Sequence, residues 1–452
     1  VRSRIETISV FTERLHSAGV EIVIPYICNQ TIAGDPSTRR GIWMFYDHWE
    51  EYSEFGFEER PADPIEWLAR EPYGRPHYNY EKRHRAFLPL GEQRYAPCPN
   101  NLHYRTYQKA IVENIAKVGY DGVFVDNNIV NCYCRYCQQG FKEYLLSRYS
   151  EEEIKRVFGF SDPSEIHLST KGNALHWVKT HPTFRTFLRE SLRPQDLERW
   201  LGTTDPVTAP IEEGGNGWLW NLSRRYLRWL SARYPPEKIQ EMTTTPDPSL
   251  WGIADEKDRA LWAETKLFWA ASVARNLHFI RDVGQRIASR FVVVPNWGEM
   301  QHSDGAHFRE EIGHDAAVWS PHSDWMMFEE SNAPGRVSPG VYLDFILQLK
   351  YASSLGVNGA ILHQGGRDPA TAELSYAECL SCLGTYIQPG TDFPSTRSAY
   401  RAFQENNGEL LEGWSPGDEV GLAYFFSQLR LENHRHLDLV YKTSRYLLDQ
   451  HI

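Results

Sequence analysis

The chain has 452 residues, of which 41% are hydrophobic and 24% charged, as in folded globular proteins. This length favours one barrel-sized domain with additional material, or two to three smaller domains. The 48 basic and 59 acidic residues give a formal charge of −11, which disfavours nucleic acid and anionic lipid as partners.

Targeting and membrane signals are missing from the sequence. No apolar run reaches the roughly 18 residues of a membrane-spanning helix, and no basic-then-apolar leader opens the chain. We therefore expect a soluble protein without membrane partners and assign it to the cytoplasm. Because the chain starts at Val1 without an initiator Met, we also expect that part of the native N-terminus, with any export signal, has been removed.

The first elements alternate between helix and strand. Helical spacing of apolar residues predicts a helix that ends near Gly19, and the β-branched run Glu21–Ile27 predicts a buried strand. The following stretch, 28–101, is rich in Gly, Pro and aromatic residues and is predicted as a long loop, a feature that is commonly functional. We expect Trp43 and Asp47 of this loop to wall a ligand pocket; a packed satellite cluster is the alternative.

The alternation continues through the middle of the chain. A predicted helix, His103–Gly119, leads into the strand Tyr120–Asn128. Residues 138–290 are predicted to be mostly helical and to include an inserted excursion at about 150–260. A long helix, Leu261–Ile287, ends this region.

Three further strands follow, at Phe291–Trp297, Asp324–Ser331 and Gly359–Gln364, with a helix predicted at Val341–Gly356. Strands joined by crossover helices imply a parallel sheet, either a barrel or a doubly wound sheet. We favour a (β/α)8 TIM barrel over residues 1–413, possibly without its first strands, because polar residues gather at the C-terminal ends of the apolar strands, where barrel enzymes carry their chemistry. A Gly-rich strand-to-helix turn typical of nucleotide binding is absent.

The last part of the chain predicts a new unit. After a helical segment at Ala399–Leu411, the run Glu419–Ser427 is typical of a strand that leads into a helix. We interpret residues 417–452 as the start of a second, flavodoxin-like α/β domain that the chain does not complete.

Four of the seven cysteines suggest a metal site in the Cys-rich loop 98–137. Cys132, Cys134 and Cys137 form a CxCxxC array, and Cys98 precedes them as a possible fourth ligand. Four thiolates suit a closed structural zinc site. Disulfides and free thiols are the alternatives, although three cysteines within six residues cannot all pair locally without strain.

The segments Tyr95–Arg105 (YAPCPNNLHYR) and Asn131–Leu145 (NCYCRYCQQGFKEYL) resemble glycoside hydrolase family 42 β-galactosidases, in which a similarly placed Cys joins a CxCxxC array on zinc. The resemblance extends in segment order to about Ser427 and implies a barrel, a carbohydrate substrate and a homotrimer. The family carries Asn-Glu at the end of strand four and a nucleophilic Glu on strand seven. This chain has Asp126-Asn127 at the first place and no Glu in Gly359–Gly366, so it is more similar there to α-galactosidase-like and fucosidase-like barrels, which pair a strand-four nucleophile with a strand-six carboxylate.

Cleavage of a glycosidic bond needs two carboxyl groups that flank it. We predict Asp126 as the nucleophile of a retaining glycoside hydrolase and Glu329 or Glu330 as its acid/base. Adjacent strand residues face opposite sides, and we prefer Glu329 because Asp324 and Met326 then share the other face. Glu299 is the reserve candidate. A structural Asp that caps the loop is the alternative for Asp126.

The remaining polar and aromatic residues at the strand ends are predicted to bind sugar hydroxyls or stack on the sugar. They are Asn127, Asn296, Trp297, Glu299, His363 and Gln364. For a strand His or Asn, a hydrogen-bonded place in the core is the alternative. The competing function is a catalytically inactive carbohydrate-binding barrel; a metal-dependent hydrolase would need more strand-end ligands than His363.

Overall fold

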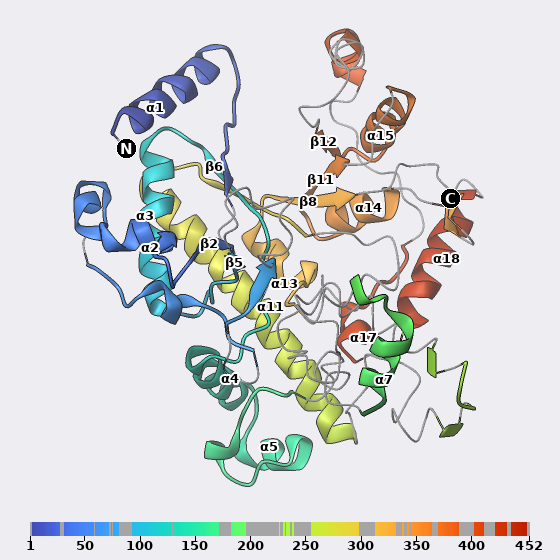
Figure 1. The fold of residues 1–452 in the computed structure, drawn as a ribbon. Helices are drawn as coiled ribbons and strands as arrows, with labels where there is room; N and C mark the ends of the chain where they lie inside the picture. The colour runs from blue at the N-terminus through green and yellow to red at the C-terminus, as the bar shows by residue number, and fades with distance from the viewer. Residues whose placement is uncertain are drawn as a thin grey trace.

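The fold is described from a computed structural model (Figure 1). The described residues are 2–27, 31–57, 59–71, 74, 76–80, 93–128, 130–170, 182–195, 226, 229–230, 232–235, 237–238, 255–297, 312–330, 337–338, 341–342, 345–363, 369–387, 402–410, 421–431 and 435–449. None of the helices in these residues has the length and apolar character to cross a membrane.

Six parallel strands form the frame of the molecule. They fall into two sheets of three, each with its strands in chain order. The strands are β1 (Tyr26–Ile27), β6 (Gly122–Val125), β7 (Val292–Pro295), β8 (Trp325–Glu330), β11 (Asn358–His363) and β12 (Thr385–Ile387).

The two sheets are joined at their facing edges. Asn296, directly after β7, forms a parallel bridge with Met327 of β8, and the Trp297 amide donates to the Met327 carbonyl at 2.8 Å. The spatial order is therefore β1, β6, β7, β8, β11, β12, without a reversal. A doubly wound sheet reverses its strand order at a switch point, whereas a barrel keeps it. The described strands thus form a mixed α/β fold that is compatible with a barrel.

The two faces of the strands carry different clusters. Residues such as Val123, Val125, Val293 and Phe328 belong to the main core, to which the helices contribute. The alternate residues Phe124, Val294, Met327 and Ala360 form a smaller cluster, whose other described members come from the strands or their flanks. Among the described residues, helices cover one face and residues of the strands and their flanks line the other, which is compatible with the outside and inside of a small barrel.

Helices pack on the first face. The long helix α11 (Glu256–Gln285) crosses the molecule beside α3 (Leu102–Lys117) and α4 (Arg135–Arg148) (Figure 1). Side chains that cap the first turn start two of them: Asn101 accepts hydrogen bonds from two amides of α3, and Asp255 accepts one from α11. The helix predicted at Leu261–Ile287 is confirmed, with an earlier start.

Further helices of the described residues precede, connect or follow these strands in the chain. They are α1 (Arg2–Ser17), α5 (Glu151–Phe158), α7 (Pro182–Ser191), α13 (Ala316–Trp319), α14 (Ile346–Ser354), α15 (Pro369–Ser381), α17 (Phe426–Arg430) and α18 (Arg435–Asp449). Most of the excursion predicted at about 150–260 lies outside the described residues.

The long loop predicted at 28–101 is in part a folded unit. It contains the antiparallel sheet β3 (Arg40–Gly41), β2 (Ile32–Asp35), β5 (Gln93–Tyr95), β4 (Tyr78–Tyr80), and the helix α2 (Ile42–Asp47). Its strands are only two to four residues long, too short for their alternation to predict a strand. Fully buried aromatic residues such as Trp49 and Trp67 hold the unit together.

Two other local predictions are wrong. The helix expected from Val341 starts only at Ile346, and the short strand β10 (Val341–Tyr342) pairs with β9 (Val337–Ser338) before it. Residues 421–425, within the strand expected at Glu419–Ser427, have no strand structure, and α17 follows. Instead of pairing in a new sheet, this segment packs on the main core, where Tyr424 contacts Tyr351 edge to face.

Candidate functional site

Asp126 follows strand β6 directly and is 7% exposed. Its Oδ1 accepts hydrogen bonds from the Asn127 amide at 2.9 Å and from Asn296 Nδ2 at 2.8 Å. Its Oδ2 accepts from Asn127 Nδ2 at 2.7 Å and from the Tyr26 hydroxyl. Four donors satisfy a carboxylate that would otherwise be costly to bury.

The chain turns sharply after this carboxylate. Asn127 adopts a φ of 52°, in the left-handed region that Asn tolerates better than most residues. This conformation lets both its backbone and its side-chain amide contact Asp126. The next residue, Asn128, is fully buried, and its Nδ2 donates to the Val125 carbonyl at 2.7 Å. Strain and buried polar groups of this kind are frequent at functional sites.

Asn296 connects Asp126 to the predicted partner carboxylate. Its Nδ2 also donates to Glu329 Oε2, at 2.9 Å. Since one nitrogen contacts both carboxylates, their nearest oxygens lie at most about 6 Å apart. Asp126, Asn296 and Glu329 thus meet at the C-terminal ends of the neighbouring strands β6, β7 and β8.

Strand alternation explains why these three side chains meet. Asp126 is two residues beyond Phe124, Asn296 two beyond Val294, and Glu329 two beyond Met327, and all three apolar residues belong to the smaller cluster. The three polar residues therefore continue that face. Met326, by contrast, belongs to the main core on the other face. The preference for Glu329 over Glu330 assumed this placement of Met326.

The other residues predicted for this site are described only in part or not at all. The backbones of Glu330 and His363 lie opposite each other in the β8–β11 pair. The side chains of both lie outside the described part of the structure, as do Glu299 and Gln364 entirely. Their roles stay predictions.

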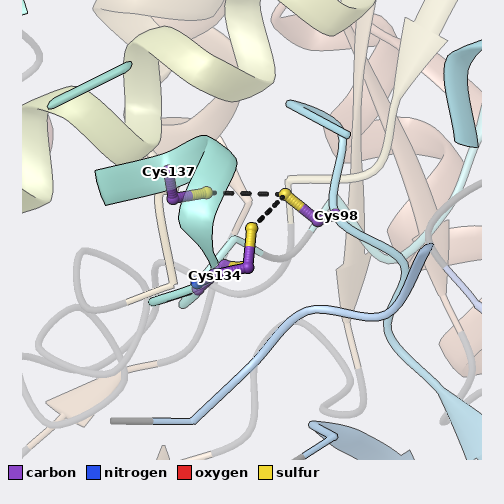
Figure 2. Close-up of side chains that lie close together, drawn as sticks. Cys98, Cys134 and Cys137 are labelled. Atoms are coloured by element: carbon purple, nitrogen blue, oxygen red, sulfur yellow. Dashed lines mark hydrogen bonds between the residues drawn. The ribbon is translucent and has the colours of Figure 1, made fainter. Parts of the chain in front are cut away.

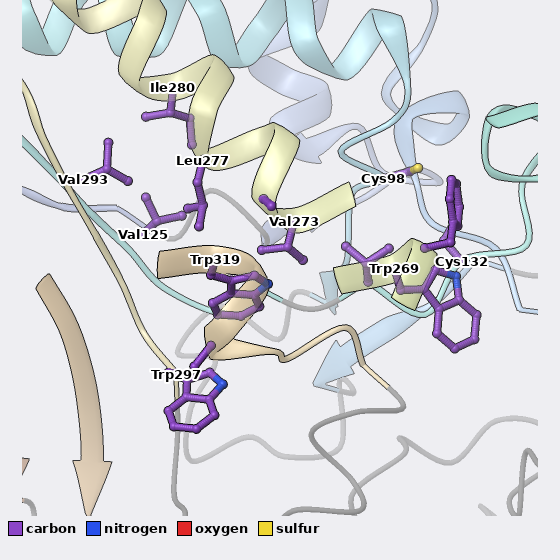
Figure 3. Packing of buried hydrophobic residues seen from close by; sticks show 14 of the residues in the cluster. Cys98, Val125, Cys132, Trp269, Val273, Leu277, Ile280, Val293, Trp297 and Trp319 are labelled. Carbon is purple, nitrogen blue, oxygen red and sulfur yellow. The ribbon is translucent and has the colours of Figure 1, made fainter. Parts of the chain in front are cut away.

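Two predicted aromatic binding residues are core residues instead. Trp297 is 3% exposed and packs on Phe328 and Tyr351 in the main core, near Trp319 (Figure 3). Trp297 directly follows Asn296, so its side chain points to the opposite face, which the helices cover. Trp43 is fully buried, and its indole donates to Asp63 at 2.9 Å.

Asp47, the other residue expected to wall the pocket, is tied to its neighbours. It pairs with Arg39, which also contacts Asp63 at 2.7 Å, and lies 3.8 Å from Arg60. These arginines lower the pKa of Asp47, first through the Arg39 hydrogen bond. The arrangement is a surface ion-pair network on the small antiparallel sheet unit, and a role in binding stays a prediction.

Sequence reasoning missed Tyr26. It lies on β1, opposite Phe124 of β6, on which its ring packs at 5.2 Å, and its side chain is 68% exposed. The signal was present in its position: Tyr26 stands near the C-terminal end of the first predicted strand, and a polar group there reaches the same rim as Asp126. Because the strand order was unknown, nothing linked the two residues.

The four cysteines predicted as metal ligands lie together. Their sulfur atoms are all within 4.8 Å of one another, and all four side chains are buried. Cys98 Sγ is 3.4 Å from Cys137 Sγ and 3.6 Å from Cys134 Sγ (Figure 2). A disulfide requires about 2.05 Å, so these are free thiols, whereas four thiolates around one tetrahedral zinc ion lie about 3.8 Å apart. The group fits a metal ion.

The surroundings of the cluster also suit thiolate ligands. The amides of Arg70 and Cys134 both donate to Cys132 Sγ at 3.4 Å, and Asn100 Nδ2 donates to Cys137 Sγ at the same distance. Hydrogen bonds from the neighbouring thiols, that of Cys132 first, lower the pKa of Cys134, whereas burial raises the pKa of Cys98. Donors to metal-bound sulfur are the usual outer contacts of such sites.

The cluster joins three segments near the candidate site. Cys98 precedes α3, Cys132 and Cys134 lie on the loop after β6, and Cys137 is in the first turn of α4. An ion held here would fix the loop that begins at Asp126. Cys379, outside this cluster, is a buried thiol in the main core, and burial raises its pKa.

Comparison with known protein families and with curated proteins finds no match to this chain. Among solved structures, a β-galactosidase from the psychrophilic Marinomonas ef1 aligns with a TM-score of 0.49 and 10% identity over 94% of this chain. The alignment covers 56% of that enzyme, so the chain spans about half of its length.

Two further solved structures are similar. The catalytic domain of a β-amylase from Paenibacillus polymyxa has a TM-score of 0.41 and 9% identity, over 84% of this chain and 79% of that one. An agarase, AgWH50C, has a TM-score of 0.28 and 9% identity, over 65% of this chain and 35% of that one.

Proposed function

We propose that this protein is a retaining glycoside hydrolase with a (β/α)8-barrel catalytic domain, in which Asp126 is the nucleophile and Glu329 the acid/base. The observation that carries the proposal is the Asn296 amide, which bridges the two carboxylates at 2.8 and 2.9 Å. Retaining glycosidases hold their carboxyl groups about 5–5.5 Å apart, and inverting ones about 6.5–9.5 Å apart. Nearest oxygens within about 6 Å support retention.

The strand order supports the barrel. If β6 is the fourth strand, as the family resemblance implies, β7, β8, β11 and β12 become strands five to eight, and β1 becomes strand three. Asp126 and Glu329 then stand at the ends of strands four and six. This is the pairing of the α-galactosidase-like and fucosidase-like barrels.

The reaction follows from these positions. A carboxylate oxygen of Asp126 attacks the anomeric carbon while the glycosidic C–O bond breaks, and Glu329 gives its proton to the departing oxygen. In the second step Glu329 takes a proton from water, whose oxygen attacks the anomeric carbon and releases Asp126. The donors around Asp126 hold the attacking carboxylate in place, and the Asn296 amide contacts both acidic side chains.

We further infer that Cys98, Cys132, Cys134 and Cys137 hold a structural zinc ion. When bound, the ion adds rigidity to the loop after β6, and the closed set of four sulfur ligands leaves no position for a substrate. The chemistry then rests on the carboxylates alone.

The decisive experiment uses aryl glycosides of several sugars and both anomers. A substrate turned over by the wild-type protein is tested with Asp126→Gly in the presence of azide; formation of a glycosyl azide with inverted anomeric configuration supports a nucleophile. The exposed Glu373→Gln on α15 is the matched control and keeps full activity. The wild-type protein could instead bind a sugar without turning it over, with equal affinity in Asp126→Asn and Glu329→Gln. That result would favour an inactive carbohydrate-binding barrel.

A further inference from the structure

A concave site lies among the helices, and none of its lining residues belongs to the strand-end site of Asp126. It is a groove of about 870 Å³ lined by the start of α3, the length of α4 and Arg275 of α11. Three arginines line it, Arg105, Arg135 and Arg275, one from each helix. On a chain with a net charge of −11, a groove with three cations and one carboxylate among its lining residues is unusual.

These arginines use few of their donors within the described structure. Arg105 donates through Nε to the Pro99 carbonyl at 2.8 Å, Arg275 donates to Ser272 Oγ at 2.9 Å, and Arg135 donates to the Tyr136 hydroxyl at 3.2 Å. No ion pair joins any of them to a carboxylate of the described residues. A guanidinium has five N–H donors in a planar fork, so each keeps donors for a ligand.

The electrostatic surroundings point the same way. Partial burial lowers the pKa of Arg105. Burial also lowers the pKa of Arg275, and the positive charge of Arg105 lowers it further. Two cations that repel each other at one wall are stabilised by an anion between them. The one carboxylate that lines the groove, Glu143, accepts a hydrogen bond from Gln139 at 2.7 Å.

The groove also offers an aromatic surface. Tyr136 and Tyr144 line it, and Arg135 lies over the Tyr136 ring at 5.0 Å. A ring next to arginine forks suits a small ligand that combines a flat or sugar-like body with an oxyanion.

We propose that this groove binds a small oxyanion-bearing ligand, with a carboxylate or phosphate held by Arg105 and Arg275 and its body against Tyr136. The site is independent of the proposed hydrolase activity, since none of its residues belongs to the strand-end site.

A competing explanation is that the arginines balance the charge of the cysteine cluster. Arg275 contacts Ser272, Ser272 accepts from Asn100 at 3.0 Å, and Asn100 reaches Cys137. Four thiolates on one divalent ion carry a net charge of −2, which two arginines would offset. In that case the groove has little affinity for an added anion.

The test is calorimetric titration of the purified full chain, at measured metal content, with inorganic phosphate and with D-glucuronate. We expect binding of at least one probe, weakened about tenfold or more in Arg105→Lys, which keeps the charge but loses the fork, and in Arg275→Gln. Arg156→Gln, whose side chain is 75% exposed on α5, is the control and binds as wild type. Binding also weakens as salt rises.

Two outcomes would overturn the proposal. One is that neither probe binds the wild-type chain. In that case, a faster loss of metal from Arg105→Lys and Arg275→Gln than from wild type would show that the arginines stabilise the cysteine cluster. The other is that both variants bind the probes as tightly as wild type. Because Arg275 is solvent-accessible and its only described hydrogen bond is to Ser272, its replacement keeps the fold, which circular dichroism verifies.

Discussion

Asp126 and Glu329 accept hydrogen bonds from the same atom, Nδ2 of Asn296, although 203 positions separate them in the chain. A single neutral donor thus sets the spacing of the two acidic side chains.

Replacing Asn296 by Ala removes the shared donor. We expect kcat/KM on the identified substrate to fall about 100-fold or more, because the two carboxylates lose their common anchor, and the free energy of unfolding to fall by about 1–3 kcal/mol. Steady-state kinetics and urea denaturation measure the two effects. Asn407→Ala, which removes an amide hydrogen bond to the Phe403 carbonyl, is the control. Unchanged kinetics in Asn296→Ala would remove Asn296 from the site.

Glu329→Gln tests the acid/base role through the leaving group. Without a proton donor, a poor leaving group suffers most, so we expect a loss of about 10²–10⁴-fold on an alkyl glycoside and a much smaller loss on a dinitrophenyl glycoside. The comparison of the two substrates separates a lost acid from a misfolded protein, since misfolding lowers both rates equally. Equal losses would contradict the role of Glu329.

Tyr26→Phe removes the hydroxyl that donates to Asp126 but keeps the ring, which packs on Phe124, at a residue that is 68% exposed. We expect kcat to fall about tenfold, with a melting temperature within a few degrees of wild type. Tyr446→Phe, at a similarly exposed position on α18, keeps full activity. If Tyr26→Phe has the wild-type kcat, the hydroxyl does not position the nucleophile.

The purified protein should contain about one zinc ion per chain, as measured by atomic emission. Cys98→Ser should lower this content and destabilise the fold by several kcal/mol, since an ion held by the four sulfurs would tie the segment before α3 and the start of α4 to the loop after β6. Cys382→Ser, outside the cluster, should change neither quantity. Full zinc content in Cys98→Ser would place the metal elsewhere.

The C-terminal segment is fastened to the core by an ion pair between Arg430 of α17 and the buried Asp315. Arg430→Met leaves that carboxylate unpaired, and we expect a loss of about 3–5 kcal/mol at neutral pH. Adding Asp315→Asn should recover much of the loss, because the Asn side chain can still cap α13.

The same pair predicts a pH dependence. Burial raises the pKa of Asp315 above its unfolded value, and Arg430 lowers it. A raised pKa stabilises the fold below the unfolded pKa and loses that effect as pH rises through the folded value. The defect of Arg430→Met should therefore be smaller near pH 4.5 than near pH 7.5, as measured by urea denaturation at both values. An equal defect at both values would show that Asp315 stays ionised without its partner.

Several parts of the site were predictable from local pattern. The strand Gly122–Val125 and the polar residues after it stand out because a buried parallel strand is a run of apolar residues that ends abruptly. The preference for Glu329 followed from alternation alone. The CxCxxC spacing, with Cys98 before it, indicated all four members of the cluster that the structure brings together.

Other parts depended on long-range pairing. Trp297 and Trp43 resemble ligand-stacking residues in the sequence, but both are buried. Whether such a side chain is buried depends on which distant elements pack over it, and each of the two lies in a packed cluster. The small antiparallel sheet within 28–101 was hidden, since its strands are short and their partners distant.

By itself, the sequence determined the main buried strands, the long helix α11 and the polar residues at the strand ends that could carry chemistry, because these properties follow from spacing within one turn or one strand. The tertiary structure alone decided that β6, β7 and β8 are neighbours, that Tyr26 reaches Asp126, and that one Asn amide serves two carboxylates. These contacts join residues about 30 to 200 positions apart, and strand order and packing, which set them, are properties of the whole chain.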